Sequence, residues 1–282
     1  MKQMAKPVIS VLMGVYYRRA DLSYLSASVS SILSQTYADF EFLICDDGST
    51  KEAAELLDRF AAQDARIRLI RPGNMLSLPQ KLNACLREAR GTFVARMDDD
   101  DRSVSNRFER QLSALQAHPD IAFVGGNVAL SRDNEVFSYR FFPEYPTVED
   151  FFMTQPYIHP TLFLRREALE AVNGYCEEPY CDHCEDYDLL LRLYAAGMRG
   201  MNLQQILLLY NAPDARGNRT MRHRFNESYT RWKRFGQMRL FPRAFPYVIK
   251  PIAAGLLPTP ILRRLKDRKH TPLSRESGGY SE

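Results

Sequence analysis

Short runs of apolar residues alternate with helical patterns over about the first 130 residues, and this alternation limits the possible folds more than any other feature. Five runs rich in β-branched residues are typical of strands, and they cover residues 8–16, 40–47, 67–72, 93–101 and 121–130. Helical spacings of three and four lie between them, over residues 22–35, 51–64, 78–89 and 105–118. We therefore predict an α/β fold with a mostly parallel sheet flanked by helices and joined by right-handed crossovers.

Helix starts can also be predicted, since serine is a favoured N-cap residue. Ser77 and Ser105 are the candidates for the third and fourth helices. After residue 130 the alternation loosens. The stretch "HPTLFLRREALEAVNGY" predicts one more strand and a helix that ends at Gly174, and a further helix is expected to begin near Asp186.

The last part of the chain differs in character from the rest. A basic helical stretch follows Met221, and an apolar run interrupted by Pro251, Pro258 and Pro260 follows it. We expect one unit over residues 1–215 and a basic, apolar, helical C-terminal region over residues 216–282, with the last residues disordered. Because no uninterrupted apolar window is long enough, we expect no membrane-spanning helix.

Charge and cysteine content exclude some functional classes. The net charge of +4 is too small to indicate nucleic-acid binding by itself. The number of cysteines is odd, at five, and Met1 is not followed by the apolar core or cleavage site of a signal peptide. We therefore expect a reducing, cytoplasmic environment rather than a secreted disulfide framework.

Four consecutive aspartates, Asp98 to Asp101, follow the fourth predicted strand in "ARMDDDDRS". Carboxylates this close repel one another unless a cation, hydrogen-bond donors or bulk water offsets the repulsion. Asp46 and Asp47 end the second predicted strand, and neighbouring parallel strands end at the same edge of a sheet, where ligands bind in open α/β folds. Clustered carboxylates suit a hard divalent cation that completes its shell with substrate phosphates, so a phosphate ester or a nucleotide is expected. The alternatives are a solvated acidic turn for the run and ordinary turn and cap chemistry for "DDGST".

A third acidic element, "CEDYDLLLRL", places Glu185, Asp186 and Asp188 in the first turn of an amphipathic helix. Acids in a first turn interact favourably with the helix dipole, which is one explanation. The other is a general base. Transfer to a hydroxyl needs a carboxylate that is not bound to the metal, because metal binding removes its basicity.

Five segments in this order and spacing resemble the inverting nucleotide-sugar glycosyltransferases of family 2, which have the GT-A fold. They are "PVISVLMGVYY", "SVSSILSQTYADFEFLICDDGST", "GTFVARMDDDDRSVSNRFERQL", "HPTLFLRRE" and "CEDYDLLLRL". The resemblance covers about residues 7–210. It implies a nucleotide-binding part over about residues 1–130 and an acceptor part over about residues 131–215.

The resemblance implies a role for each matching residue. Val15 and Tyr16 would flank the nucleotide base, and Asp47 would accept a hydrogen bond from the uracil ring. Asp98 or Asp99 would contact the ribose, and Asp100 would bind Mg²⁺ or Mn²⁺ on the diphosphate. Asp101 is expected to be structural, as a cap or as the ion-pair partner of Arg102 or Arg107. Asp186 would be the base, with Glu185 beside it.

Two positions depart from the family pattern. Tyr17 stands where the family usually has Asn, which could change the loop over the nucleotide. After the strand "ILLLY" the family often has Arg and a metal-binding His, whereas this chain has Pro213 near the expected His. His223 lies ten residues farther on and is not assigned. The metal is therefore less firmly implied than the nucleotide site.

The function implied by the resemblance is transfer of a sugar, from a UDP-sugar donor, to a hydroxyl of a growing surface glycan or of its lipid carrier. The base deprotonates this hydroxyl as it attacks C1, so that one displacement inverts the anomeric carbon. A catalytically silent, nucleotide-sugar-binding partner subunit is the alternative. A nucleotidyltransferase would need a glycine-rich phosphate loop after the first strand, and "GVYYRRADL" lacks those glycines.

Two further features of the sequence concern metals and membranes. Cys176, Cys181, His183 and Cys184 offer four possible zinc ligands, but their irregular spacing argues against zinc. The C-terminal residues, about 240–270, combine apolar side chains with flanking arginines and lysines. We expect this tail to contact the inner face of the cell membrane without crossing it. Packing over the rest of the protein, or an oligomer contact, is the alternative.

Overall fold

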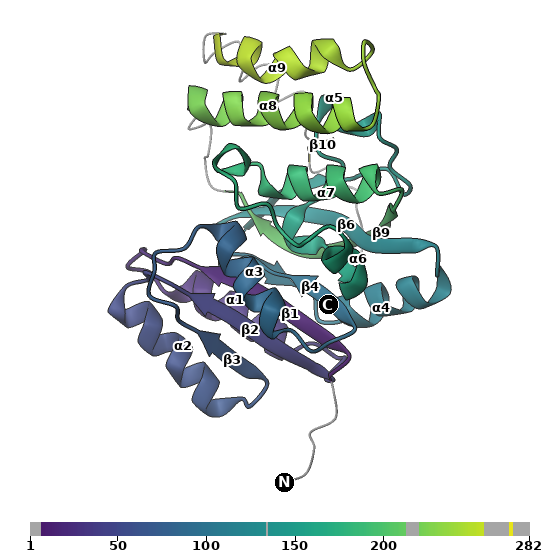
Figure 1. Cartoon of the computed structure of the whole chain (residues 1–282). Helices are drawn as coiled ribbons and strands as arrows, with labels where there is room; N and C mark the ends of the chain where they lie inside the picture. The colour runs from purple at the N-terminus through teal and green to yellow at the C-terminus, as the bar shows by residue number, and fades with distance from the viewer. Residues whose placement is uncertain (1–6, 134, 213–219, 257–270, 273–282) are drawn as a thin grey trace.

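The computed structural model describes residues 7–133, 135–212, 220–256 and 271–272. One curled sheet runs through this part of the chain, with helices on both sides (Figure 1). Its strands are β1 (Ile9–Val15), β2 (Phe40–Asp46), β3 (Ile67–Ile70), β4 (Phe93–Arg96), β5 (Arg102–Ser103), β6 (Ile121–Arg132), β7 (Glu135–Arg140), β8 (Phe163–Arg165), β9 (Arg199–Asn211) and β10 (Thr271–Pro272). The expectations for Pro213 and for the last residues of the chain lie outside the described residues.

The helices alternate with strands up to α4, as the apolar pattern predicts. They are α1 (Ser23–Leu33), α2 (Lys51–Gln63), α3 (Leu78–Glu88), α4 (Arg107–Ala117), α5 (Asp150–Met153), α6 (Arg166–Ala171), α7 (Glu185–Ala195), α8 (Met221–Gln237) and α9 (Phe245–Leu256), with short 3₁₀ turns at His159–Thr161 and Pro179–Cys181. The prediction of a helix ended by Gly174 is confirmed. Gly174 has a φ of +64° and its N–H donates to the carbonyl of Leu169.

The first part of the sheet is parallel, in the order β3, β2, β1, β4. Val15 at the end of β1 lies opposite Asp46 at the end of β2, so the carboxyl ends of these strands meet at one edge. β1 is fully buried along its length, which is why its sequence is continuously apolar rather than alternating.

The rest of the sheet is mixed, so the prediction of a mostly parallel sheet holds only for its first part. β8 is antiparallel to both β4 and β6, and β7 is antiparallel to β6. β6 and β7 are joined by a short turn, and such a turn can connect only antiparallel strands. β9 runs parallel to β6 and pairs at its far end with β5, where Arg102 lies opposite Leu209. This pairing brings the end of β9 to the acidic run.

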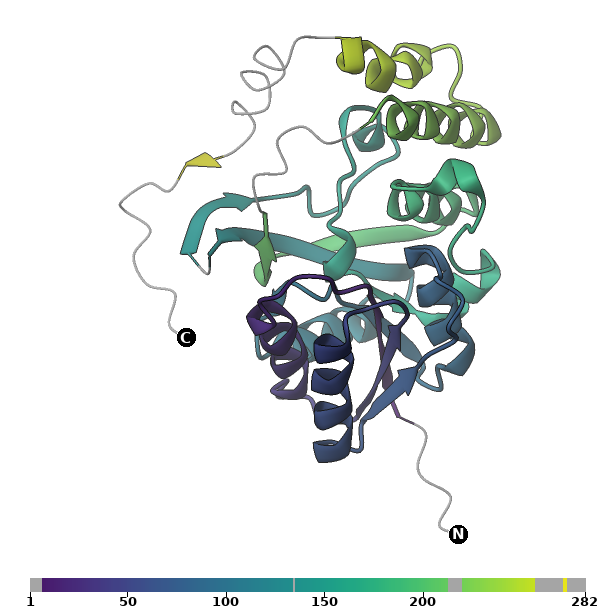
Figure 2. The ribbon, with the colours of Figure 1, turned by 90° about the vertical axis from the view of Figure 1, so that its left-hand side faces the viewer.

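Helices α7, α8 and α9 form successive layers on one side of the sheet (Figures 1 and 2). Arginines on α8 join these layers: Arg234 Nε donates to Asp188 Oδ1 on α7 at 2.7 Å, and Arg224 Nη1 donates to the carbonyl of Pro251 on α9 at 3.1 Å. Phe235 on α8 and Val248 on α9 belong to the same apolar core as α7. Over the described residues, every helix is too short or too polar to span a bilayer.

Two local predictions concern helix starts. Ser77 is the N-cap of α3, as predicted, and its N–H donates to Gln80 Oε1 at 2.9 Å. The prediction for α4 is wrong by one residue, since its N-cap is Asn106 rather than Ser105. The backbone N–H of Thr36 donates to the carbonyl of Ser105, so Ser105 is bound to the loop that follows α1.

Candidate active site

The fourth strand ends at Arg96, two residues before the acidic run, so the four aspartates lie on the loop that follows β4 rather than on the strand. Arg96 is 1% exposed, and its Nη2 lies 2.6 Å from Asp98 Oδ1. The backbone carbonyl of Asp98 accepts a hydrogen bond from Ser28 Oγ on α1 at 2.6 Å. These contacts fix the start of the run at the edge where β1 and β4 end.

Asp100 already holds a positively charged group. Its Oδ2 accepts from Arg19 Nη2 and from Asn211 Nδ2, each at 3.1 Å. Arg19 comes from the loop after β1 and Asn211 from the end of β9. Asp100 therefore lies where the parallel part of the sheet meets the end of β9.

The other two aspartates of the run differ from each other. Asp101 is 1% exposed, and its Oδ1 accepts from the backbone N–H of Asn211 at 2.7 Å. Its identified partner is the β9 backbone, and the predicted cap or ion pair with Arg102 or Arg107 stays a prediction. Burial, and then the charges of Asp100 and Asp98, raise the pKa of Asp99 to about 7. A divalent cation would relieve this repulsion and lower that pKa.

A buried lysine joins the ends of β1 and β2. Lys81 on α3 is 3% exposed, and its Nζ donates to the carbonyls of Val15 at 2.6 Å and Asp47 at 2.9 Å. Asp47 Oδ2 accepts from the N–H of Leu76 at 2.6 Å, so this carboxylate also ties down the loop before α3. The sequence places Val15 and Asp47 correctly at one edge, and the structure adds the cation that holds them together.

Tyr16 projects from this edge, with half of its side chain exposed. Lys81 Nζ lies 5.0 Å from the centre of its ring. Val15, by contrast, is completely buried, and its carbonyl accepts from Lys81 Nζ, so in this structure it offers no surface to a ligand. Tyr17 is also buried: its hydroxyl donates to the carbonyl of Asp21 and its N–H donates to Ser49 Oγ. The departure from Asn at this position therefore stiffens the loop that carries Tyr16 and Arg19.

Glu185 and Asp186 form the first turn of α7, as predicted. Asp186 Oδ2 accepts from Gln155 Nε2 at 2.9 Å, and its Oδ1 accepts from the N–H of Tyr187 at 2.7 Å. Burial, and then the charge of Asp186, raise the pKa of Glu185 to about 7. A carboxyl group that titrates near neutral pH is suited to accept and release protons.

The two acid groups lie within electrostatic reach of each other across the end of β9. Burial, and then the charges of Asp98, Asp101, Asp100 and Asp186, raise the pKa of Tyr210 on that strand. The charge of Asp98 also acts on Glu185. The run after β4 and the first turn of α7 therefore act electrostatically on common groups, and we treat them together as one candidate site.

The acidic edge fits a divalent cation that takes few ligands from the protein. Among the described residues, groups of three metal-ligating atoms within 4.8 Å of one another occur elsewhere: Cys176, Cys181 and Asp188, and separately Asp182, His183 and His223. At the edge, Asp100 with its Arg19 partner offers a ligand that already attracts positive charge. One or two carboxylates completed by substrate phosphates are the usual environment of Mg²⁺ with nucleotides.

The four ligands that the sequence offered for zinc do not form one group. Cys176 and Cys181 lie with Asp188, whereas His183 lies against His223, with ring centres 3.9 Å apart. His159 is buried, and its Nε2 is 2.9 Å from the hydroxyl oxygen of Tyr175. It is a partnered core residue in this structure.

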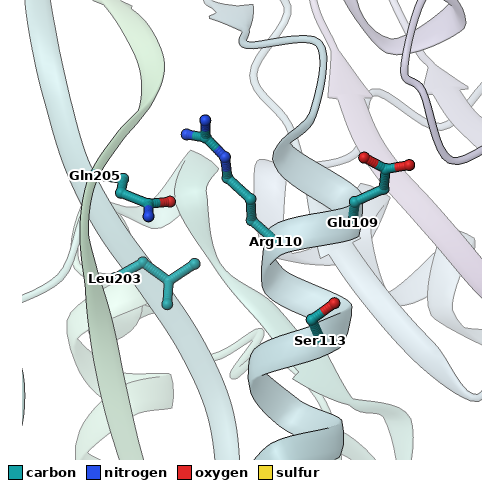
Figure 3. Close-up of a pocket in the computed structure, with 5 residues that line it drawn as sticks. All are labelled: Glu109, Arg110, Ser113, Leu203 and Gln205. Atoms are coloured by element: carbon teal, nitrogen blue, oxygen red, sulfur yellow. The ribbon is translucent and has the colours of Figure 1, made fainter.

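A hollow of about 320 Å³ lies between α4 and β9 and is separate in its residues from the acidic edge. Figure 3 shows Arg110 reaching towards Gln205, while Glu109 points to the other side of α4. The remaining lining residues are Ser113 and Leu203. With a single outward-pointing acid, this hollow has no arrangement for metal or base chemistry, so we place the site at the acidic edge.

Comparison with known proteins decides the family. The model of the family "Glycosyl transferase family 2" matches residues 10–172. The chain belongs to this family. Putative glycosyltransferase EpsE of Bacillus subtilis is 30% identical over 265 residues, which cover 93% of this chain and 94% of EpsE. The O-antigen biosynthesis glycosyltransferase WbnJ of Escherichia coli is 32% identical over 210 residues, or 72% of this chain and 79% of WbnJ.

Solved glycosyltransferases share the fold. TarS 1–349 of S. aureus, in complex with UDP-GlcNAc, has a TM-score of 0.65 at 14% identity, covering 86% of this chain and 72% of TarS 1–349. The match covers only 43% of a longer TarS chain. The mannosyltransferase PcManGT of Pyrobaculum calidifontis, in complex with GDP-Man and Mn²⁺, has a TM-score of 0.60 at 17% identity, covering 94% of this chain and 81% of PcManGT. The predicted GT-A fold is thereby confirmed.

Sequence reasoning missed several groups at the family 2 site. Lys81, Arg19, Asn211 and Gln155 each contact a predicted site residue. They come from α3, from two loops and from the end of β9, so no local motif joins them to the acids. The one signal available was the buried position of Lys81 on the apolar face of α3, since a lysine buried there needs acceptors.

Proposed function

We propose that this family 2 glycosyltransferase moves a sugar from a UDP-sugar donor to a hydroxyl group of a glycan or lipid-linked acceptor, with inversion at C1. One observation carries the proposal: two acid groups with different partners share one edge of the sheet. Asp100 is paired with the cation Arg19, and Asp186 accepts from Gln155 Nε2 and from the N–H of Tyr187 at the start of α7. The first suits a metal and a diphosphate, the second a base.

The donor would bind along the ends of β1, β2 and β4. Tyr16 is exposed and can stack on the nucleotide base, and Asp47 can accept from its ring N–H if the hydrogen bond from Leu76 is shared. Asp98 or Asp99 would accept from the ribose hydroxyls. Arg19, which can turn from Asp100 to a phosphate oxygen, would stabilise the departing diphosphate.

Asp100 would hold Mn²⁺ or Mg²⁺ on the diphosphate. When bound, the cation supplies positive charge that stabilises the leaving group. Asn211 would orient the Asp100 carboxylate, since its Nδ2 donates to the same Oδ2. The complex of PcManGT with GDP-Man and Mn²⁺ supports a divalent metal, and that of TarS 1–349 with UDP-GlcNAc supports a UDP-sugar.

Asp186 would take the proton of the acceptor hydroxyl as that oxygen attacks C1. Gln155 and the N–H of Tyr187 hold its carboxylate in place. Glu185, next to it, would be ionised above neutral pH, and its negative charge would make Asp186 a stronger base. One displacement from the face opposite the leaving group inverts the anomeric carbon.

The acceptor would be a growing cell-surface polysaccharide or its lipid carrier, and the enzyme would act at the inner face of the membrane. The role of WbnJ in O-antigen biosynthesis supports this class of acceptor. The outer layer of the protein supports the location. Trp232 on α8 and Phe245 and Ile249 on α9 expose about half of their side chains, with Arg243 nearby in sequence. Aromatic and basic side chains together suit an anionic membrane surface.

Product stereochemistry tests the proposal. The full-length protein, Mn²⁺ and an α-linked UDP-sugar would be incubated with polyprenyl-diphosphate sugar acceptors, and the anomeric proton of the product would be examined by NMR. A β-linked product supports a single inverting displacement, and an α-linked product contradicts it. Tight UDP-sugar binding without turnover on any acceptor, and without slow donor hydrolysis, would instead favour the silent partner subunit.

A further inference from the structure

Two cysteines lie close together on the segment that leads from α6 into α7. The Sγ atoms of Cys176 and Cys181 and a carboxylate oxygen of Asp188 all lie within 4.8 Å of one another. Cys176 is partly exposed, whereas Cys181 is completely buried. All five cysteines of the chain are free thiols. One member of this pair is therefore open to small reagents, and the other lies beneath it.

The surroundings of Cys176 favour its reactive form. Its Sγ lies 3.6 Å from the hydroxyl oxygen of Tyr180, which also accepts a hydrogen bond from Lys233 Nζ at 2.8 Å. The Cys181 thiol lowers the pKa of Cys176 to about 6 and itself has a raised pKa. A thiolate is the nucleophilic form of cysteine, and a thiolate beside a protonated thiol is the arrangement found in dithiol redox motifs.

A metal is a poorer explanation of the cluster than thiol chemistry. Both carboxylate oxygens of Asp188 are already bound by arginines, Oδ1 by Arg234 Nε and Oδ2 by Arg192 Nε, each at 2.7 Å. A structural zinc ion needs four ligands, and a carboxylate neutralised by two guanidinium groups is a weak one. A disulfide needs only the two sulfurs.

We propose that Cys176 and Cys181 form an oxidisable thiol pair, which a peroxide converts into a disulfide that inhibits glycosyl transfer. The Cys176 thiolate attacks one oxygen of hydrogen peroxide, the O–O bond breaks, and the sulfenic acid of Cys176 and hydroxide form. Cys181 then attacks the Cys176 sulfur, the S–O bond breaks, and its thiol proton leaves with the hydroxyl group as water. Two thiols lose two electrons and the peroxide, with one further proton, becomes two water molecules.

The inhibitory step rests on the proposed function, because it acts through the proposed base. The N–H of Cys184 donates to the carbonyl of Cys181 at 2.9 Å, and the N–H of Asp188 donates to the carbonyl of Cys184 at 2.9 Å. These bonds connect Cys181 to the first turn of α7, which carries Glu185 and Asp186. A disulfide requires the sulfurs to approach to about 2 Å, so closing it pulls on that turn.

The chain contains a matched control pair. The thiol of Cys85 lowers the pKa of Cys45, so these two cysteines also interact closely. Both, however, are completely buried in the core beside β1 and β2. If access through Cys176 is what makes a pair oxidisable, the Cys45–Cys85 pair must stay reduced in the folded protein.

Peptide mapping tests the thiol chemistry without any assay of activity. The folded full-length protein is treated with hydrogen peroxide near neutral pH, alkylated, unfolded, labelled with a second alkylating agent, digested and analysed by mass spectrometry. We expect a Cys176–Cys181 disulfide while Cys45 and Cys85 take the second label. In Cys181→Ser, a sulfenic acid trapped by dimedone should accumulate at Cys176. Unmodified Cys176, or equally fast oxidation of the Cys45–Cys85 pair, overturns the proposal.

A transfer assay tests the inhibitory step. Oxidation should lower transfer by roughly 10- to 100-fold, the loss expected when a catalytic group is misplaced by about 1 Å, and a dithiol reductant should restore it. Cys176→Ser should be active and insensitive to peroxide. A disulfide that forms without loss of transfer overturns the inhibitory step. An inactive untreated protein counts against the proposed function instead, and peptide mapping still decides the thiol pair.

Discussion

Carboxylates at the acidic edge differ in their neighbours, and the neighbours separate structural from chemical roles. Asp101 accepts from the backbone of Asn211 and is almost completely buried. Asp100 pairs with Arg19 and keeps about a quarter of its side chain exposed. A carboxylate with a mobile, exposed counter-ion can exchange that partner for a metal and a diphosphate, whereas a buried one held by backbone cannot.

Replacing Asp100 with Ala should abolish metal-dependent UDP binding while the fold persists. Loss of groups that merely orient metal ligands lowers metal affinity by about 10- to 100-fold, so loss of the ligand itself should cost at least as much. Calorimetric titration of UDP with and without Mn²⁺ measures this. Asp58→Ala is the control. Asp58, on α2, forms an ion pair with Arg71, and the variant should bind UDP normally. Unchanged affinity in Asp100→Ala would remove the metal assignment.

Transfer should rise with pH through about 7. Burial and the charge of Asp186 raise the pKa of Glu185 to about 7, so Glu185 keeps a proton below that pH and loses it above. Because the negative charge of Glu185 makes the neighbouring Asp186 carboxylate a stronger base, kcat/KM should increase between pH 6 and pH 8. Glu185→Gln removes the neighbouring charge and should flatten this part of the profile.

Asp186→Asn should keep donor binding and lose roughly 10²- to 10⁴-fold in transfer, the usual contribution of a general base. The shape of the side chain is retained, and its contact with Gln155 can be kept. Rate measurements at saturating donor separate binding from chemistry. If Asp186→Asn keeps its transfer activity while Glu185→Gln is inactive, the base is Glu185.

Among the structural elements, the turn after β2 has a steric requirement at Gly48. Gly48 has a φ of +91°, and a Cβ at this position would lie 2.8 Å from Met75 Sδ and 2.9 Å from Tyr16 Cε2. The turn therefore presses against the loop before α3 and against the aromatic ring proposed to contact the nucleotide base. This close approach requires a residue without a side chain.

Gly48→Ala should lower the free energy of unfolding by about 1–2 kcal/mol, the cost of a left-handed residue with a Cβ, and should also weaken UDP binding because Tyr16 is displaced. Gly73→Ala is the matched control. Gly73 has a φ of +71°, but a Cβ there has nothing within 4 Å. It should lose similar stability in urea unfolding and keep its UDP affinity. Equal UDP affinity in both variants would contradict the proposed contact between Tyr16 and the nucleotide base.

The elements that carry their own periodic pattern were predictable, and those defined by distant contacts were not. β1, β2, α2 and α3 are continuous apolar or amphipathic segments, so their bounds follow from the sequence. The antiparallel placement of β8 beside β4 depends on which strand edges remain open, which no local pattern records. For the same reason the acids at the edge were predicted, while Lys81 and Asn211, brought there by α3 and β9, were not.

At the scale of the whole molecule, α7, α8 and α9 lie in successive layers leading away from the sheet (Figure 1). We call the exposed side chains of Trp232, Phe245, Ile249 and Leu256 the outer apolar surface. Trp232 lies 4.9 Å from Phe241 and 6.5 Å from Phe245, measured between ring centres. The sequence predicts a membrane contact at about residues 240–270, of which 257–270 lie outside the described residues, and Trp232 on α8 would extend this candidate surface.

Flotation with anionic liposomes tests this surface. The full-length protein should float with the vesicles and should be released by high salt, since basic side chains contribute about 1 kcal/mol each. Ile249→Glu with Leu256→Glu should remain in solution, because these side chains are 45% and 75% exposed and the fold does not need them. Phe141→Glu, at a site 58% exposed outside this surface, should still float. If all three proteins float alike, this surface is not the membrane contact, whereas a soluble acceptor is favoured if none of them floats.

Donor turnover tests the central claim most directly, that the acidic edge is a metal-dependent nucleotide-sugar site with Asp186 as its base. Nucleoside diphosphate release would be followed for a panel of UDP- and GDP-sugars with Mn²⁺, with and without acceptor. We predict release from at least one UDP-sugar, lost on chelation of the metal and in Asp100→Ala, and greatly reduced with acceptor in Asp186→Asn. Release that is unaffected by chelation and by both substitutions would contradict the account.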